Sequence, residues 1–249
     1  MRQENSLMSY RVLIPARLGS TRLPNKPLKD ILGKTLLQRV VEQSKKSSAK
    51  SVHVATDSIE IIKHCDELNI ESILTSTEHQ TGSDRLAESC NILELDDEEI
   101  IINVQGDEPF IDPQDINQLA NLAISKKANM VTLFADLNKK EFADNNVVKL
   151  WLGSDSRVED FSREINHLKP EEAKKHLGVY GYKVSFLRSF VQWNQTVNES
   201  HRNLEQMRAM DNGEKIYAIK SEGKYHLGVD TENDLQAAIV IAKSLNESN

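Results

Sequence analysis

The amino-acid sequence predicts an α/β fold with a mostly parallel sheet and helices on both faces. Short β-branched runs alternate with amphipathic helical patterns in the first half of the chain, which favours parallel strands joined by right-handed crossovers. Residues 100–104 are almost continuously apolar, as in a central strand covered on both sides. A basic loop follows the first apolar run, at the position where open α/β sheets bind ligands.

The first predicted elements follow one another as strand, helix, strand, helix, strand. The strands lie at 11–14, 51–55 and 71–75, and the helices begin near 35 and 59. A polar loop at 76–85 then runs into a further helix. After the strand at 100–104, Pro113 begins another helix, and a strand at 130–134 follows.

Beyond about residue 136 the regular alternation breaks down. Strands are expected at 147–152 and 176–182, separated by a charged, irregular stretch at 154–175. A helix at 203–211 closes with Asn212-Gly213, a strand follows at 215–219, and residues 228–231 form a strand-to-helix junction before the last helix. We therefore expect a flexible tail at 1–9 and a single domain at 10–249 with an insertion at about 136–185.

The bulk composition excludes several classes of protein. The 249 residues carry a formal net charge of -7, which argues against general binding to nucleic-acid backbones. Cys65 and Cys90 fall in helical patterns and are expected to be reduced core thiols. The sequence shows no signal peptide and no apolar segment of membrane-spanning length, so we expect a cytoplasmic protein without a membrane partner.

The loop at 15–28 reverses the charge of the chain locally. Residues 11–41 contain seven basic side chains and one acid. Arg17, Arg22 and Lys26, together with small residues and three stiffening prolines, suit a strongly anionic ligand.

Asp107 is the most informative acid because it follows the buried strand directly. Gly106 gives backbone clearance beside it, and a carboxylate in this position is a natural ligand for Mg²⁺. The alternative is a turn or helix-capping aspartate. Phosphate-binding cations and a metal-binding acid together indicate nucleotidyl or phosphoryl transfer.

Three further residues have both a chemical and a structural interpretation. Asp230 could supply a second carboxylate or simply cap the last helix. His176 and Tyr180 alternate on one face of a predicted strand, so both could enter a cleft, although a structural histidine is an equal alternative. P-loop, dinucleotide-binding, zinc and hydrolase motifs are absent from the sequence.

Eight groups of residues, in order along the chain, resemble one known family. They are Ile14-Pro15-Ala16-Arg17 with Ser20-Thr21-Arg22-Leu23-Pro24 and Lys26-Pro27-Leu28, Ala55-Thr56-Asp57, Gln105-Gly106-Asp107-Glu108-Pro109, His176-Leu177-Gly178-Val179-Tyr180, Leu204-Glu205-Gln206-Met207-Arg208, and Gly228-Val229-Asp230-Thr231. The family is that of the 3-deoxy-manno-octulosonate cytidylyltransferases, or CMP-Kdo synthetases. The resemblance implies a Rossmann-like nucleotide-diphospho-sugar transferase fold and a homodimer formed through the inserted region. It also implies activation of Kdo by CTP with Mg²⁺, for lipopolysaccharide biosynthesis.

The resemblance also implies roles for individual residues. Arg17, Lys26, Asp107 and Asp230 would be catalytic, the two acids holding the metal. The nucleotide would be bound by Ala16, Arg17, Ser20, Arg22, Lys26, Gln80, Thr81, Gly82, Ser83 and Arg85. The sugar acid would face Gln105, Arg163, His176, Tyr180, Glu205 and Gln206.

The chain departs from the family pattern on the side of the sugar. Residues 164–168 after Phe161-Ser162-Arg163 lack the usual small residue, Ile-Pro, aromatic and arginine, and Asp160 replaces an aromatic residue. Residues 200–203 replace a glutamate-bearing turn. The acceptor could therefore be Kdo or a relative such as 8-amino-Kdo. A nonulosonate or phosphonate acceptor, and a non-catalytic CTP-binding regulator, remain as alternatives.

Overall fold

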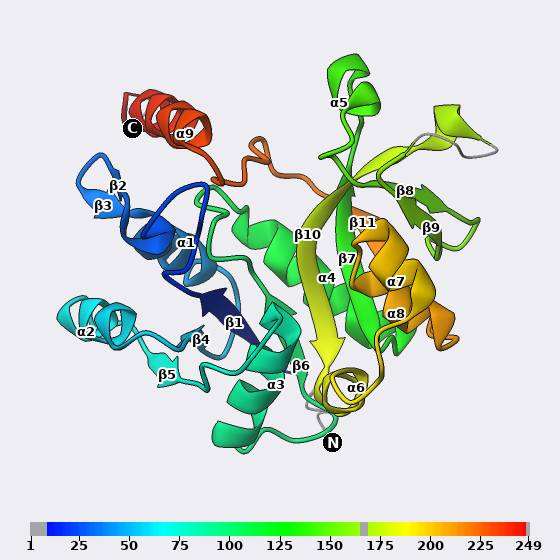
Figure 1. The fold of residues 1–249 in the computed structure, drawn as a ribbon, viewed down its shortest axis with the longest axis horizontal. Coiled ribbons are helices and arrows are strands. Elements are labelled where there is room, and N and C mark those ends of the chain that lie inside the picture. The colour runs from blue at the N-terminus through cyan, green and yellow to red at the C-terminus, as the bar shows by residue number, and fades with distance from the viewer. Residues whose placement is uncertain (1–8, 165–168, 248–249) are drawn as a thin grey trace, which may run out of the picture.

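Nine strands form one sheet within residues 9–164 and 169–247, the part of the chain that the computed structural model describes (Figure 1). Along the sheet the order is β11-β7-β10-β6-β1-β4-β5, and β8 and β9 extend it from β10. The strands are β1 (Tyr10–Ala16), β4 (Val52–Thr56), β5 (Ser72–Leu74), β6 (Ile100–Asn103), β7 (Met130–Ala135), β8 (Lys149–Leu152), β9 (Val158–Ser162), β10 (Lys174–Lys183) and β11 (Ile216–Lys220).

The central strands β5, β4, β1 and β6 are parallel, as is the pair β7 and β11, whereas β10 runs antiparallel to both β6 and β7. The predicted α/β fold with a mostly parallel central sheet is confirmed. A short hairpin of β2 (Asp30–Ile31) and β3 (Lys34–Thr35) lies apart from the main sheet.

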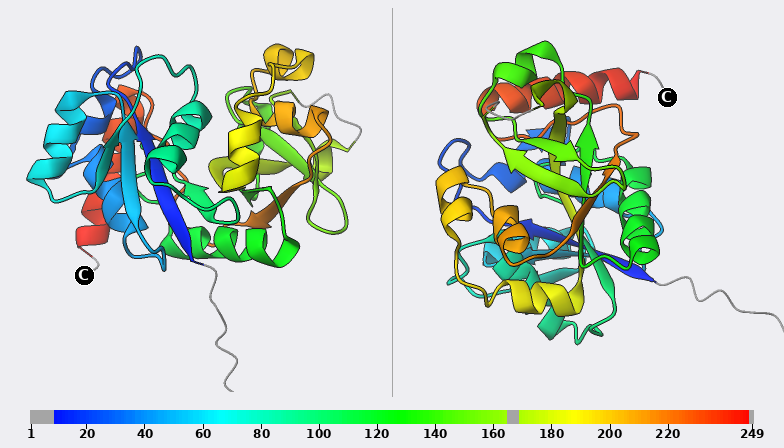
Figure 2. Two further views of the ribbon diagram at one scale, coloured as in Figure 1. Left: turned by 90° about the horizontal axis from the view of Figure 1, so that it is seen from below. Right: turned by 90° about the vertical axis from the view of Figure 1, so that its right-hand side faces the viewer.

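Helices lie on both sides of the sheet, and the views in Figures 1 and 2 agree on their arrangement. One end of the molecule carries α1, α2 and α9, and the other carries β8, β9, α7 and α8. The helices are α1 (Leu36–Ser44), α2 (Ile59–Glu67), α3 (Gly82–Ile92), α4 (Pro113–Lys126), α5 (Lys139–Ala143), α6 (Val184–Phe190), α7 (Val197–Arg202), α8 (Gln206–Asp211) and α9 (Glu232–Asn246), with short 3₁₀ turns η1 (Lys26–Leu28) and η2 (Pro170–Glu172).

Alternate residues of the central strands enter two separate cores. Val12 and Ile14 of β1 pack with residues of α1 and α4, whereas Leu13 packs with residues of α3 and α6. All four residues of β6 are buried. The inference that this strand is covered on both faces is therefore confirmed, because successive side chains of a strand point to opposite sides.

A third apolar cluster joins distant parts of the chain near one end of the sheet. It contains Leu23, Ile31, Leu36, Phe110, Val229, Leu235, Ala238 and Ala242. These residues come from the loop after β1, the β2–β3 hairpin, α1, the segment after β6, and α9 with the residues before it. The first loop and the last helix are therefore held together by burial of apolar surface.

The first half of the fold follows the sequence prediction closely, with one correction. The helix expected from Pro113 is α4, and Thr35 caps α1 by accepting a hydrogen bond from the Gln38 backbone N–H. The loop expected at 76–85 is shorter, because α3 already begins at Gly82. Thr81 and Asp84 form a reciprocal capping box, which starts the helix there.

The second half differs more from the sequence prediction. The stretch at 154–175 is not irregular throughout, since it contains β9. The helix expected at 203–211 is the shorter α8, and α7 precedes it as a separate helix that the sequence analysis did not predict. Asn203 ends α7, and its φ of 53° is left-handed. Gly213 closes α8 with a φ of 83°, as expected for a helix end. Residues 228–231 follow a loop rather than a strand, because β11 ends at Lys220.

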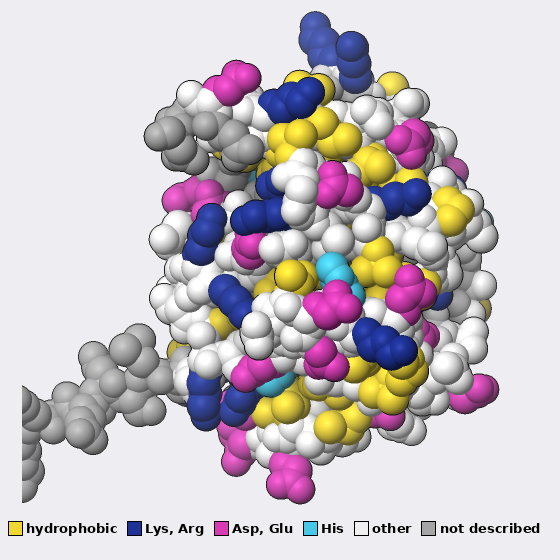
Figure 3. Space-filling model, turned by 90° about the vertical axis from the view of Figure 1, so that its left-hand side faces the viewer, with side chains coloured by type: hydrophobic (Ala, Val, Ile, Leu, Met, Phe, Trp, Pro, Cys, Tyr) yellow, Lys and Arg dark blue, Asp and Glu magenta, His cyan; other side chains and the backbone are white. Residues whose placement is uncertain are grey.

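The predicted tail and the departure from the family pattern at 165–168 lie largely outside the described residues. The domain limits and the insertion at 136–185 stay predictions. Cys65 and Cys90 are free and buried, as expected, and burial raises the pKa of the Cys65 thiol to about 11. No helix of the described residues is both long and apolar enough to cross a membrane. Basic and acidic side chains are interspersed on the face shown in Figure 3.

Candidate active site

A cavity of about 350 Å³ opens at the carboxyl ends of β1 and β6, beside the amino end of α3. Twelve residues predicted from the sequence line it, namely Ala16, Arg17, Ser20, Arg22, Lys26, Gln80, Thr81, Gly82, Arg85, Gln105, Asp107 and Asp230. Six others line it without having been predicted, namely Pro15, Gly19, Thr21, Pro27, His79 and Gly106. Four of them already lie within the quoted motifs without having been assigned to the site, and Gly19 and His79 each adjoin a predicted residue.

Lys26 links the two predicted metal-binding acids. Its Nζ lies 2.5 Å from Oδ2 of Asp107 and 3.0 Å from Oδ1 of Asp230. Arg22 adds a second cation at 3.1 Å from the other oxygen of Asp230. Burial alone would lower the pKa of Lys26, but the two carboxylates raise it above its ordinary value. Burial likewise opposes ionisation of Asp230, yet Lys26 and Arg22 hold its pKa below the usual range.

The main chain brings Asp107 and Asp230 together across more than one hundred positions of sequence. The backbone N–H of Val229 donates to the carbonyl oxygen of Asp107 at 2.9 Å, which ties the segment before α9 to the end of β6. Thr231, rather than Asp230, caps α9 in a capping box with Asp234. The carboxylate of Asp230 is therefore left to face Lys26 and Arg22.

Gly106 is required by a close backbone approach. A Cβ atom at this position would lie 2.8 Å from the carbonyl oxygen of Pro15, closer than real Cβ contacts. The clearance expected here is thus confirmed, and it lets the turn after β6 pack directly against the end of β1.

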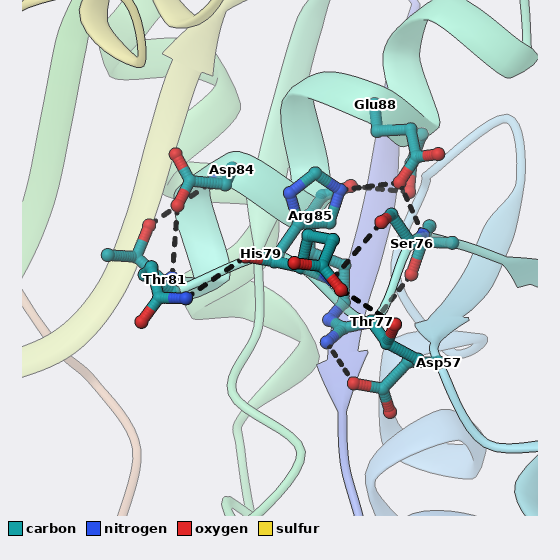
Figure 4. A network of polar contacts seen from close by, with 12 residues as sticks. Asp57, Ser76, Thr77, His79, Thr81, Asp84, Arg85 and Glu88 are labelled. Carbon is teal, nitrogen blue, oxygen red and sulfur yellow. Dashed lines mark hydrogen bonds and ion pairs between the residues drawn. The ribbon is translucent and has the colours of Figure 1, made fainter.

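Arg85 braces the wall of the cavity (Figure 4). Its guanidinium forms an ion pair with Asp57 at 2.6 Å and donates to the hydroxyl oxygen of Thr75. Asp57 and Thr75 follow the ends of β4 and β5, so one buried arginine on α3 links three elements. The adjoining loop is fixed by Glu88, which accepts from the Ser76 backbone N–H at 2.8 Å and contacts Nε2 of His79 at 2.5 Å.

Gln105 connects this cavity to an irregular part of β10. Its side-chain amide donates to the carbonyl oxygen of Gly178 at 3.2 Å, within a bulge between Leu177 and Tyr180. The bulge interrupts the regular alternation expected for this strand, although the rings of His176 and Tyr180 still lie 5.4 Å apart.

His176 is neutral and has a defined orientation. Burial, with Arg163 nearby, lowers its pKa to about 3. Its Nε2 lies 3.0 Å from the hydroxyl oxygen of Thr132, which also lies 2.9 Å from the Val179 carbonyl oxygen. Because the hydroxyl has one proton to donate to a carbonyl, it accepts from Nε2–H of the imidazole. This assigns Nδ1 of His176 as an available acceptor.

Glu205 and Gln206 present buried polar atoms at the start of α8. Ser83 donates to Oε2 of Glu205 at 3.1 Å, so the structure places Ser83 beside Glu205 rather than in the wall of the cavity. Within the described residues, Oε1 of Glu205 and Nε2 of Gln206 have no hydrogen-bond partner. An unpaired buried polar atom costs about 1–3 kcal/mol, so these atoms suit a polar ligand.

Arg163 does not line the cavity that holds Lys26. It lines a second cavity of about 460 Å³, together with Asp160, Arg202 and Asn203 among others. Asp160, which stands where the family has an aromatic residue, forms an ion pair with Arg202 at 2.5 Å. The charged substitutions therefore link β9 to α7.

Comparisons with known proteins agree with this architecture. A family model described as cytidylyltransferase matches residues 11–216. The 3-deoxy-manno-octulosonate cytidylyltransferase of Idiomarina loihiensis is 39% identical, over 94% of this chain and 99% of its own length. The 3-deoxy-manno-octulosonate cytidylyltransferase of Polynucleobacter asymbioticus is 43% identical, over 91% of this chain and 93% of its own length. A solved CMP:2-keto-3-deoxy-manno-octonic acid synthetase complexed with CTP matches with a TM-score of 0.87 and 32% identity, over 95% of this chain and 99% of that one.

An α/β sheet with a basic, acid-containing cavity at its carboxyl edge defines a nucleotidyltransferase, and the chain belongs to the cytidylyltransferase family. The identity and coverage of its relatives narrow this class. Within it, the chain is a member of the 3-deoxy-manno-octulosonate cytidylyltransferase family. The resemblance in its motifs is thereby confirmed.

Proposed function

We propose that the chain transfers a cytidylyl group from CTP to a 3-deoxy-octulosonate sugar acid, giving the CMP-sugar and pyrophosphate. The observation that carries this proposal is the contact of Lys26 with both Asp107 and Asp230 at the cavity lined by Arg17 and Arg22. The names of the curated relatives support Kdo, or a close relative of Kdo, as the acceptor. The product would serve lipopolysaccharide biosynthesis.

The triphosphate would bind in the basic part of the cavity. Arg17, Ser20, Arg22 and Lys26 all line this cavity and offer charged or hydroxyl donors. Residues 80–85 include the start of α3 at Gly82, and the amino end of a helix favours an anion through its free N–H groups. The cytidine would lie along this wall, which Arg85 braces through Asp57.

Asp107 and Asp230 fit a magnesium ion that is shared with substrate phosphates. One carboxylate oxygen of each lies within hydrogen-bond reach of the same ammonium, so both are aimed at one point. Within the described residues no three acidic, histidine or cysteine side chains form a metal-binding group, so phosphate and water would complete the coordination. When bound, Mg²⁺ would compensate phosphate charge and make the acceptor hydroxyl more acidic.

The protein's own residues would then bind and align the two substrates. Arg17 and Lys26 would stabilise the negative charge that develops on pyrophosphate as it leaves. Gln105 and neutral His176, with Nδ1 as an acceptor, would orient the hydroxyls of the sugar acid. Glu205 and Gln206 would pair their buried polar atoms with it. The acceptor oxygen would thereby be held in line with the α-phosphorus.

The remaining family properties are part of the same proposal. We propose a cytoplasmic homodimer whose inserted region, about 136–185, contributes to the dimer contact. The ion pair between Asp160 and Arg202 lies near the predicted sugar side, so it is expected to influence which acid is accepted.

Pyrophosphate release from CTP and Mg²⁺, measured with a panel of sugar acids, tests the proposal. Release with Kdo or 8-amino-Kdo is the expected result. Release only with a nonulosonate or a phosphonate would assign a different acceptor. Tight CTP binding without release for any acid would instead indicate the non-catalytic regulator.

A further inference from the structure

Lys149 is a fully buried lysine at the first position of β8. Its side chain is 0% exposed, and it is followed in the strand by Leu150 and Trp151, which are also buried. Burial lowers the pKa of its ammonium group. Removing an ammonium from water costs several kcal/mol unless other groups compensate. An apolar residue would avoid this cost, so the charge calls for a specific explanation.

The ammonium of Lys149 is bound by main-chain carbonyl groups. It donates to the carbonyl oxygen of Asp144 at 2.6 Å and to that of Arg163 at 2.9 Å. The ion pairs found among the described residues do not include Lys149. One ammonium thus joins the loop before β8 to the residue that directly follows β9.

Arg163 binds the next two carbonyl groups of the same loop. Its Nη1 donates to Asn146 at 3.2 Å and contacts the Asn145 oxygen at 3.5 Å. Lys149 and Arg163 therefore hold three successive carbonyl oxygens, and Lys149 also holds the carbonyl oxygen of Arg163 itself. The main chain of Arg163 and the loop that carries two acceptors of its guanidinium therefore depend on the position of Lys149. A third contact, from Nη2 to the Asn203 carbonyl oxygen at 3.5 Å, does not involve Lys149.

The start of β8 also lies between β9, which Arg163 directly follows, and β10, which carries His176 and Tyr180. Lys149 pairs with Ser162 of β9 on one side and with Lys175 of β10 on the other. The backbone N–H of His176 donates to the Val148 carbonyl oxygen at 2.9 Å. A displacement of this part of β8 would therefore be transmitted toward Arg163 and His176, and away from the cavity that holds Lys26.

We infer that Lys149 is a positioning residue for the acceptor, which fixes the guanidinium of Arg163 at the second cavity through two main-chain carbonyl groups. The inference rests on the proposed function, since that function assigns Arg163 to the sugar-acid side. Lys149 does not contact the substrate in this arrangement. Its effect reaches the acceptor through Arg163.

Steady-state kinetics of Lys149→Met, with each substrate varied in turn, tests this role. We expect the KM for the sugar acid to rise about 10- to 100-fold, as for a misplaced orienting group, and the KM for CTP to change less than about twofold. Lys183→Met is the matched control because Lys183 lies at the other end of β10, in a surface ion pair with Glu98. It should leave both constants unchanged.

A double-mutant cycle separates positioning from general stability. In an Arg163→Ala background, Lys149→Met should raise the KM for the acid far less than it does in the wild-type background, because its main target is gone and only the backbone contact to His176 remains. Lys149→Gln keeps two N–H donors in its amide, so its KM for the sugar acid should lie between those of wild type and Lys149→Met. The same measurement is made with Lys149→Gln if Lys149→Met does not fold.

Equal changes in both Michaelis constants, or unchanged constants in a folded variant, would overturn the inference. So would a full additional effect of Lys149→Met in the Arg163→Ala background. These outcomes are distinguishable from failure of the proposed function, in which the wild-type protein itself would release no pyrophosphate with any sugar acid.

Discussion

Replacing Lys26 by methionine should change the binding of CTP and of a metal ion in opposite directions. In the free protein the ammonium lies between Asp107 and Asp230 and compensates their charge. A divalent cation in the same place competes with it. The variant should therefore bind Mn²⁺, as a spectroscopic substitute for Mg²⁺, more tightly in the absence of CTP, while it uses CTP less well.

The two contacts set the size of the effect. Charge-assisted hydrogen bonds contribute about 1.5–3 kcal/mol each. The Asp230 side chain is 43% exposed, so its contact is screened by solvent and contributes less. A combined difference of about 2 kcal/mol corresponds to a roughly 30-fold tighter Mn²⁺ complex. Loss of one charge-assisted contact to the triphosphate should raise the KM for CTP by about 10- to 100-fold.

Titration of Mn²⁺ by electron paramagnetic resonance, without nucleotide, measures the first effect. Lys29→Met is the control, since it removes the same charge from the end of η1, where Lys29 is the C-cap residue. It should alter Mn²⁺ affinity less than about twofold through the change in net charge alone. Affinity in Lys26→Met equal to or weaker than that of wild type would refute competition between this ammonium and the metal.

Three other substitutions test separate parts of the structure. Asp107→Ala should abolish turnover with an unchanged circular dichroism spectrum, and substantial activity at saturating Mg²⁺ would remove its metal role. Gly106→Ala should lower the unfolding free energy by about 1–3 kcal/mol in urea titrations, because its Cβ meets the Pro15 carbonyl oxygen at 2.8 Å; an unchanged midpoint would contradict the close approach. His176 has a folded pKa of about 3 against 6.5 for the ordinary group, so its contribution is intact above pH 6.5 and is lost toward pH 3. The unfolding free energy of wild type should therefore fall more steeply over this range than that of His176→Phe, and parallel curves would argue against a buried neutral imidazole.

The elements that could be predicted from the sequence are those whose start or burial is encoded by residues within the element itself. Pro113 and Thr35 mark helix starts by their own chemistry, and residues 100–104 show the burial of β6 directly. The Thr81–Asp84 capping box was also readable from the sequence, and its spacing corrects the start of α3. Local propensity and final structure agree at these positions.

The elements that were missed depend on partners elsewhere in the chain. β9 is short and charged, and it exists as a strand because it pairs with β8. The break between α7 and α8 depends on a left-handed Asn203 that no helical pattern reveals. Lys149 sits in an otherwise apolar strand, where its acceptors are main-chain groups and leave no trace in the sequence.

In the candidate site, too, features with a local sequence signal were predictable and features that depend on distant residues were not. The basic loop could be interpreted from residues that are close in sequence, whereas the contact of Lys26 with Asp230 spans 204 positions. The residues alone left Asp230 as either a second carboxylate or a helix cap, and the resemblance to a family assigned it to the metal with Asp107. The second cavity at Arg163, formed by β9 and α7, could not be located without their tertiary placement.

The third apolar cluster holds the active-site loop against α9, so we expect loss of activity on heating to begin with the opening of this cluster. Leu23 lies in the loop that bears Lys26, and Val229 adjoins Asp230, yet both pack with α9 rather than within the two cores of the main sheet. Local opening of such a satellite cluster requires less free energy than global unfolding. Activity should therefore be lost reversibly below the main calorimetric transition, with faster amide hydrogen exchange in α9 while β1 and β6 remain protected.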